Sequence, residues 1–218
     1  MRITTEMKKL LLLCLLGFTL SSHAQLADKK FNIYGRYSFG AYDTTSYNNF
    51  GLTGEWLVHR KVGLLYNFDL TYRSDKYRHL HVPMGLIGGP ILFVAGLANI
   101  FDGDTTSSGG LSLVGIAMLV LPDGVSFHQP IGYRWDVSPY ANVLGLDFIK
   151  DQLYGYRWLK YSCSFGVRGT YVLNDQITFS PYVETRKTAG VPLGFGAGIG
   201  VGILFGERET KMEEPPVQ

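Results

Sequence analysis

The sequence has almost no cysteine, which limits how an exported chain of this size can be stabilised. Of its two cysteines, Cys14 lies in an N-terminal apolar run, so only Cys163 remains in the mature chain that we expect. No intramolecular disulfide can then form. A Walker loop, zinc-type cysteine spacing and a dinucleotide-binding fingerprint are also missing. The sequence therefore gives no sign of a nucleotide site, and we expect no cofactor and no metal.

A strong net charge is also lacking. The formal net charge is +2, and removal of a basic N-terminal segment brings the chain close to neutrality. A near-neutral chain has no global attraction for polyanions, so we expect no nucleic-acid partner.

The first 24 residues have the pattern of a secretory signal peptide. Arg2, Lys8 and Lys9 precede an apolar run, and the cleavage-site residues Ser22 to Ala24 follow it. A lipoprotein anchor at Cys14 is the alternative, but Leu13 occupies a position that requires a small residue. We therefore expect export, a mature domain over residues 25–205 and a polar, disordered tail over residues 206–218.

The last fifty residues alternate with the period of a β-strand. In the final strand, the five glycines at alternate positions from Gly194 to Gly202 lie between apolar residues. The apolar positions are Leu193, Phe195, Ala197, Ile199, Val201, Ile203 and Phe205. A soluble sandwich would expose polar side chains on its second face, whereas an apolar exterior around a polar interior is typical of a barrel in a membrane. The 14% aromatic content and 27 glycines agree with this.

The same alternation predicts eight strands, at about residues 31–41, 50–58, 62–72, 125–128, 135–143, 160–171, 177–186 and 193–205. A polar loop is expected at 43–49, and short turns at 59–61 and 173–176. Charged residues of these strands fall on the polar face, which is expected where the other face meets lipid. Placing the N-terminus in the periplasm puts both short turns on the periplasmic side.

The alternation fails between residues 75 and 122. Two segments, 83–101 and 111–121, are apolar on every face and are separated by a polar loop. They predict an apolar hairpin of buried helices in the second external loop, packed on or into the barrel. Two further strands, giving ten in all, and a transmembrane hairpin are the alternatives. The Gly88–Pro90 interruption leaves apolar runs shorter than the ~18 residues that a spanning helix needs.

On these strands and their aromatic C-terminal residue Phe205, the mature chain resembles small eight-stranded outer-membrane barrels of the OmpA and OmpX type, without a motif for a subfamily. The fold class is thus all-β, an antiparallel transmembrane β-barrel of about eight strands with an apolar helical hairpin insert. The resemblance implies a bacterial outer-membrane location in a Gram-negative cell and recognition by the barrel assembly machinery. It also implies contact with outer-membrane lipids and a monomeric state. Residues 206–218 depart from the pattern by following the aromatic signal.

Three groups of residues are candidates for function. Inward-facing charges near mid-strand predict a lumenal ion-pair network of Arg36, Glu55, Asp69, Arg168 and Glu184, with an ion path as the functional version. Cations at the outer strand ends predict a rim for anionic lipid. This rim consists of Arg73, Lys160 and Arg186, near Lys76, Arg78, Arg157 and Lys187.

The third group concerns catalysis. Ser126 and His128 share one face of a strand, as a nucleophile and base would in a lipid-modifying enzyme, but no acidic partner is defined. His79 and His81 lack a third metal ligand. We therefore expect a structural or ligand- and lipid-binding role rather than an enzyme. The alternatives are a deacylase or acyltransferase on the same barrel and a narrow pore.

Overall fold

The computed structural model describes residues 25–101, 105–151 and 157–207; the side chains of residues 25, 27, 99–110 and 151–158 are outside this description. The predicted signal peptide and all but the first two residues of the predicted tail therefore lie outside the described residues. A short 3-10 helix, η1 (Gln25–Asp28), precedes the first strand.

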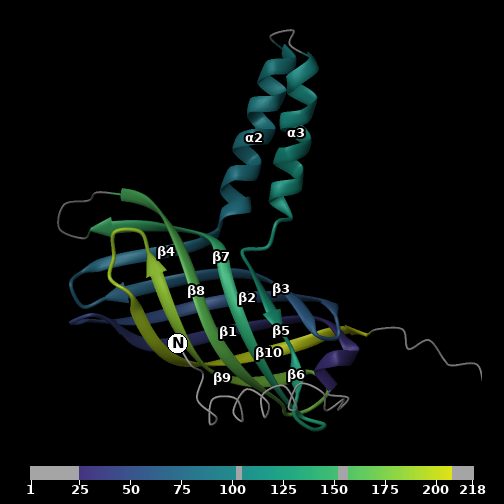
Figure 1. Ribbon diagram of the computed structural model, residues 1–218, viewed down its shortest axis with the longest axis vertical. Coiled ribbons are helices and arrows are strands. Elements are labelled where there is room, and N and C mark those ends of the chain that lie inside the picture. Colours follow the sequence, from purple (N-terminus) through teal and green to yellow (C-terminus); the bar gives the residue numbers. More distant parts are fainter. Residues whose placement is uncertain (1–24, 102–104, 152–156, 208–218) are drawn as a thin grey trace, which may run out of the picture.

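One antiparallel sheet closes on itself to form a barrel (Figure 1). Its strands are β1 (Lys29–Tyr42), β2 (Thr45–His59), β3 (Val62–Arg73), β4 (Tyr77–Pro83), β5 (Gly124–Phe127), β6 (Gln129–Pro130), β7 (Trp135–Asp151), β8 (Arg157–Val172), β9 (Ile177–Thr188) and β10 (Gly194–Glu207). β1 pairs with β10. Both β4 and β5 lie between β3 and β7, and β6 continues beside β7. The ring therefore has eight positions, as predicted.

Polar side chains face the interior and apolar side chains face outward. In β9, Ser180 and Glu184 are buried, whereas Phe179 and Val183 are 37% and 58% exposed. In the other strands, apolar or aromatic side chains such as Phe39, Phe165 and Ile203 are likewise exposed. This inverted distribution is the one expected of a barrel whose wall is surrounded by lipid rather than water.

The two ends of the barrel differ in their connections. We call the end with the β1–β2, β3–β4 and β9–β10 connections the outer end, and the end where β1 begins and β10 ends the periplasmic end, after the predicted orientation. The predicted polar loop at 43–49 is wrong: only Asp43 and Thr44 separate β1 from β2. Residues 45–49 extend β2 because their backbones continue the ladder with β1, and Asp43 has the positive φ (54°) that the tight turn requires.

The apolar insert is a pair of helices, α2 (Met84–Phe101) and α3 (Thr105–Leu119). Its predicted position in the second external loop is wrong. Residues 77–83 form β4, so the helices interrupt the fourth strand between β4 and β5. The expectation of buried helices is wrong as well, because many of the large apolar side chains of both are exposed and the described buried residues are glycines. Among the described residues, no helix combines the length and hydropathy needed to cross a membrane.

Candidate functional site

The barrel interior holds three groups of paired polar side chains, and the first contains Glu55 of β2 and Arg168 of β8. Arg168 Nη2 lies 2.8 Å from each carboxylate oxygen of Glu55. The guanidinium also lies over the ring of Tyr34, 4.7 Å from its centroid, and donates to the Tyr34 hydroxyl. Glu55 and Arg168 are 2% and 1% exposed. A two-point charge pair at this depth fixes the two strands relative to each other.

The second group contains two carboxylates and two guanidinium groups. Arg36 binds both oxygens of Asp69, with Nη2 distances of 2.8 and 2.7 Å. Arg186 also pairs with Asp69, and Glu184 lies 3.9 Å from Arg36 and 3.6 Å from Arg186. Formal charges in this group balance. Arg186, predicted at the lipid rim, is therefore an interior residue, 3% exposed, because Asp69 and Glu184 provide its partners there.

The third group lies where the fourth strand is interrupted. Asp147 accepts hydrogen bonds from Ser162 and Thr188, at 2.9 and 2.6 Å, and lies 2.8 Å from His81 Nδ1. On its other side, His81 Nε2 is 3.4 Å from Asp123. This chain of contacts connects β4, β7, β8 and β9 to the residue that immediately precedes β5.

All five predicted lumenal residues thus face inward, and each is paired within the first two groups. An eight-stranded barrel is just wide enough for its own side chains to fill. Here the charges that could have lined an ion path neutralise one another across the interior. Their arrangement favours a closed barrel over a pore.

Ser126 and His128 also face the interior, next to Glu55. The acidic partner that the sequence did not define is Asp136, which lies 2.9 Å from His128 Nδ1. His128 Nε2 is 3.1 Å from Ser126 Oγ but 2.9 Å from Glu55 Oε1. Both ring nitrogens therefore face carboxylate oxygens, which only accept hydrogen bonds. The nitrogen that would have to take a proton from Ser126 is already a donor, and Ser126 is fully buried.

The two other predicted rim residues, Arg73 and Lys160, lie at the mouth of the barrel. They line a cavity of about 430 Å³ at the outer end, together with His79 and Val191. Arg73 is paired with Asp75 and lies 5.1 Å from the ring centroid of Tyr42. Residues on the interior face of a strand meet the mouth rather than the bilayer when the strand ends. Arg73 and Lys160 therefore lie at the outer rim, where their positions at the strand ends predicted them, and their contact with anionic lipid stays a prediction.

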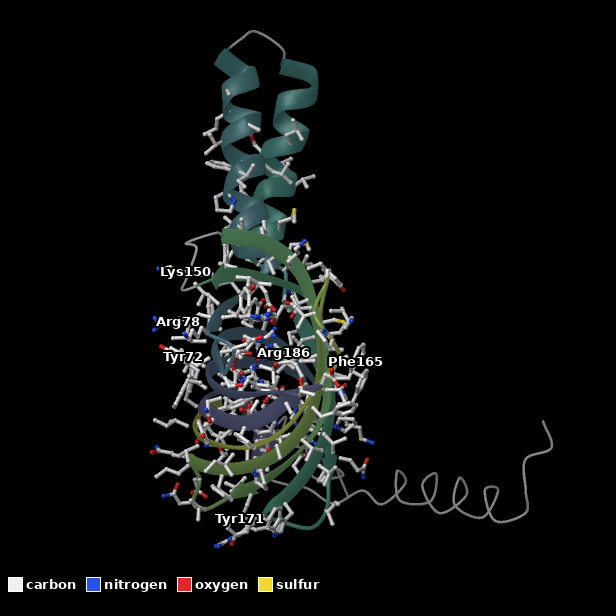
Figure 2. All side chains as sticks on the ribbon, turned by 90° about the vertical axis from the view of Figure 1, so that its left-hand side faces the viewer. Tyr72, Arg78, Lys150, Phe165, Tyr171 and Arg186 are labelled. Carbon is white, nitrogen blue, oxygen red and sulfur yellow. The ribbon has the colours of Figure 1, made fainter. Side chains whose placement is uncertain are left out.

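A different pair of cations lies on the exterior wall. Arg78 of β4 and Lys150 of β7 are direct cross-strand partners at the outer end and both are exposed. They border a groove of about 350 Å³ whose other lining residues are Leu70, Leu80, Phe148 and Ile149. Figure 2 shows Arg78, Lys150 and Tyr72 on the outside of the ring and Arg186 within it. The groove therefore combines an apolar wall with two cations at its outer end.

The charges at this groove lack a compensating acid within the part of the chain that the structure describes. Arg78 lies 5.2 Å from the ring centroid of Tyr72, and neither it nor Lys150 has an ion pair there. Like charges directly opposite each other in a sheet are destabilising. An anion bound between them would remove this repulsion. Strand parity alone would not have identified Lys150 from the sequence, because the irregularity between Asn142 and Gly145 reverses the facing of β7, so that Lys150 shares the exterior face with Phe148.

His79 and His81 come together around Asp147, at 3.7 and 2.8 Å. Over the described residues, no group of three or more His, Cys, Asp or Glu side chains has the arrangement of a metal site.

No protein-family model and no curated protein matches the sequence. Solved structures do match the fold. The N-terminal β-barrel domain of Pseudomonas aeruginosa OprF gives a TM-score of 0.51 at 9% identity, covering 82% of this chain and 98% of that one. Neisserial surface protein A gives 0.49 at 8% identity, covering 80% and 96%, and Pseudomonas aeruginosa OprG gives 0.46 at 10%, covering 84% and 100%. At these identities the likeness concerns the fold alone.

Proposed function

Since the chain has the fold of the small outer-membrane β-barrels, we propose that it is a bacterial outer-membrane protein that binds an acidic lipid on its exterior wall. The lipid phosphate would lie between Arg78 and Lys150, and its acyl chains would lie along the groove between β3, β4 and β7. The single observation that carries this proposal is the cross-strand pair of cations at the outer end of an apolar groove.

The chemistry of the groove fits a phosphorylated lipid better than a soluble anion. Arginine offers a planar set of donors that matches phosphate oxygens, and lysine adds a second positive charge. Each cation near an anionic membrane surface contributes about 1 kcal/mol of attraction. Below the cations, Leu80 and Phe148 are 46% and 37% exposed, so the groove also offers apolar contact area. A free phosphate would use only the cations.

Lipid that co-purifies with the protein tests the proposal. We expect the wild-type protein, extracted from outer membranes in mild detergent, to carry phosphorylated lipid that mass spectrometry can quantify. The Arg78→Ala/Lys150→Ala double variant should lose most of it.

The matched control is the Arg60→Ala/Lys61→Ala double variant. It removes the same two residue types from exposed positions in the β2–β3 turn at the opposite end of the barrel. Wild-type lipid content in the Arg78→Ala/Lys150→Ala variant would show that the groove is not the binding site. Equal loss of lipid from both double variants would indicate a general effect of charge.

Lipid modification is a second candidate, because His128 lies within hydrogen-bond distance of both Ser126 and Asp136. The competing contact with Glu55 favours a stabilising role for this cluster. Mass spectrometry of glycolipid from cells with and without the protein distinguishes the two. A difference in acyl pattern between cells with and without the protein would support the enzyme, provided that cells with the Ser126→Ala variant show the pattern of cells without the protein. The same acyl pattern in cells with and without the protein would support binding.

A further inference from the structure

The helical hairpin leaves the barrel through its wall rather than from either end. β4 ends at Pro83 and β5 begins at Gly124, while β3 and β7 run past both. The interruption therefore faces the middle of β3, where the Tyr66 hydroxyl donates to Val120 O at 2.7 Å. Figures 1 and 2 both show α2 and α3 projecting sideways from the ring.

Backbone hydrogen bonds close the wall where the helices leave it. The Asp123 amide donates to Leu65 O at 2.9 Å. On the opposite side, the Val143 and Leu144 amides both donate to Asp123 O, at 2.8 and 3.0 Å. The helices are thus attached at mid-wall by ordered strands on both sides. The surface around their base is the apolar exterior of the barrel, with Phe68 38% and Val143 41% exposed.

The two helices pack on each other through glycine. The described buried residues of the pair are Gly85, Gly89, Gly96 and Gly115. A Cβ on Gly89 would lie 2.9 Å from Gly115 O, and one on Gly115 would lie 2.8 Å from Gly89 O, so the backbones are in close contact. The spacing of Gly85 and Gly89 is the small-xxx-small pattern by which helices associate in lipid.

Glycine at the contact leaves the large apolar side chains on the outside. Ile91 and Val94 are each 62% exposed on α2, and Leu113 and Val114 are 69% and 50% exposed on α3. The sequence has no charged residue over 84–101 or 105–121. A hairpin in water would do the reverse, because each large apolar side chain that is removed from water contributes about 1.5–3 kcal/mol.

We propose that α2 and α3 lie among the acyl chains of the bilayer beside the barrel, as a hairpin that enters the membrane from the wall without crossing it. This rests on the proposed membrane location of the barrel. Continuity with the apolar exterior identifies hydrocarbon as the occupant of the hairpin surface, and helices satisfy their own backbone hydrogen bonds there.

The dimensions of the hairpin agree with this placement. A helix of 18 residues is about 27 Å long. The distance from the middle of the hydrocarbon to either interface is about 15 Å. A helix of this length that starts at mid-wall therefore stays within the hydrocarbon only if it runs sideways from the barrel, which is the direction that both figures show.

Spin labels on the full-length protein in lipid vesicles test the proposal. On a Cys163→Ser background, labels are placed at Val94 and Val114 of the hairpin. Phe165, 51% exposed on the wall, is the reference for lipid, and Lys76, exposed in the β3–β4 turn, is the reference for water. Electron paramagnetic resonance power saturation then compares collisions with oxygen, which partitions into hydrocarbon, and with a water-soluble nickel chelate.

We expect the Val94 and Val114 labels to match Phe165, with high oxygen and low nickel accessibility. Labels that match Lys76 while Phe165 stays in lipid would overturn the hairpin proposal and leave the barrel's location standing. If the label at Phe165 also shows the accessibility of a site in water, the hairpin proposal and the proposed membrane location of the barrel are both wrong. Low accessibility to both reagents would show that a second copy or another protein covers the hairpin, which also overturns the proposal. Heat-modifiable migration on gels confirms that each variant is folded.

Discussion

At the residue scale, stability depends on charges that are buried and paired. Glu55 has Arg168, Ser126 and His128 as partners, and each of them would remain buried after its loss. Removing one member of a buried ion pair typically costs about 3–5 kcal/mol, because the other charge stays uncompensated. The same reasoning applies to Asp69 with its two arginines.

We therefore expect Glu55→Ala to destabilise the barrel strongly. Glu207→Ala is the matched control, since Glu207 pairs with Lys29 at 3.3 Å but its side chain is 85% exposed. Such surface pairs contribute about 0–1 kcal/mol. Denaturant unfolding in detergent, followed by the folded band on unheated gels, compares the two. Equal shifts of the midpoint would mean that the interior is hydrated rather than closed.

The glycine face of β10 provides a second test at this scale. The interior tyrosines pack over it, and the helical insert does not. A Cβ at Gly198 would lie closest to Tyr37 O of the neighbouring strand and 2.7 Å from both Ser38 Cβ and Tyr182 Cζ, whereas the nearest atom to a Cβ at Gly200 would be Tyr34 Cδ2 at 3.3 Å. Overpacking of a filled interior costs about 1–3 kcal/mol.

Gly198→Ala should thus lower the unfolding midpoint more than Gly200→Ala, although the two glycines are neighbours on one face of one strand. Ile199→Leu, which changes an exterior side chain that is 48% exposed, should have little effect. Similar behaviour of both glycine variants on gels would show that the tyrosine packing over β10 is not fixed.

At the element scale, the fourth strand of the ring is made from two separate segments. On β3, His81 pairs with Asp69 and Gly124 pairs with Leu65. If Pro83 were joined directly to Asp123, both pairs would fall on one continuous ladder with no shift in register. On β7, the existing irregularity between Asn142 and Gly145 accommodates the difference in register between the pairings of β4 and of β5.

We expect a variant that lacks residues 84–122 to fold into a heat-modifiable barrel, because one uninterrupted strand replaces β4 and β5. A second variant that also lacks Asp123 is the control. It breaks the register by one residue and turns the side chains of one half of the strand to the wrong face. Failure of the first deletion to fold would show that the hairpin is required for assembly of the wall.

At the scale of the whole molecule, the barrel is closed by its own side chains. Arg36, Asp69, Glu184 and Arg186 form a balanced group across the interior, with the Glu55 group beside it. Ion conduction would require these pairs to separate in a medium of low dielectric constant, where their attraction is strong.

The protein reconstituted in planar bilayers should accordingly show no steady single-channel conductance at neutral pH. A porin inserted under the same conditions controls for the bilayer. Regular channel openings that disappear in the Arg36→Ala/Arg186→Ala variant would contradict this expectation and support a pore function.

The sequence by itself determined the eight positions of the ring, the facing of the strands and the inward placement of the five lumenal charges. These features depend on alternation along single strands, which is a local property. Only the tertiary structure decided which charges pair, that Arg186 is interior, that Asp136 and Glu55 contact His128, and that Arg78 lies opposite Lys150. Pairing depends on register between strands, and residues as distant as Glu55 and Arg168 meet only when the ring closes. The path of the hairpin through the wall could not be predicted from the sequence for the same reason. A strand split by an intervening pair of helices is recognisable only when both halves lie between the same two neighbours.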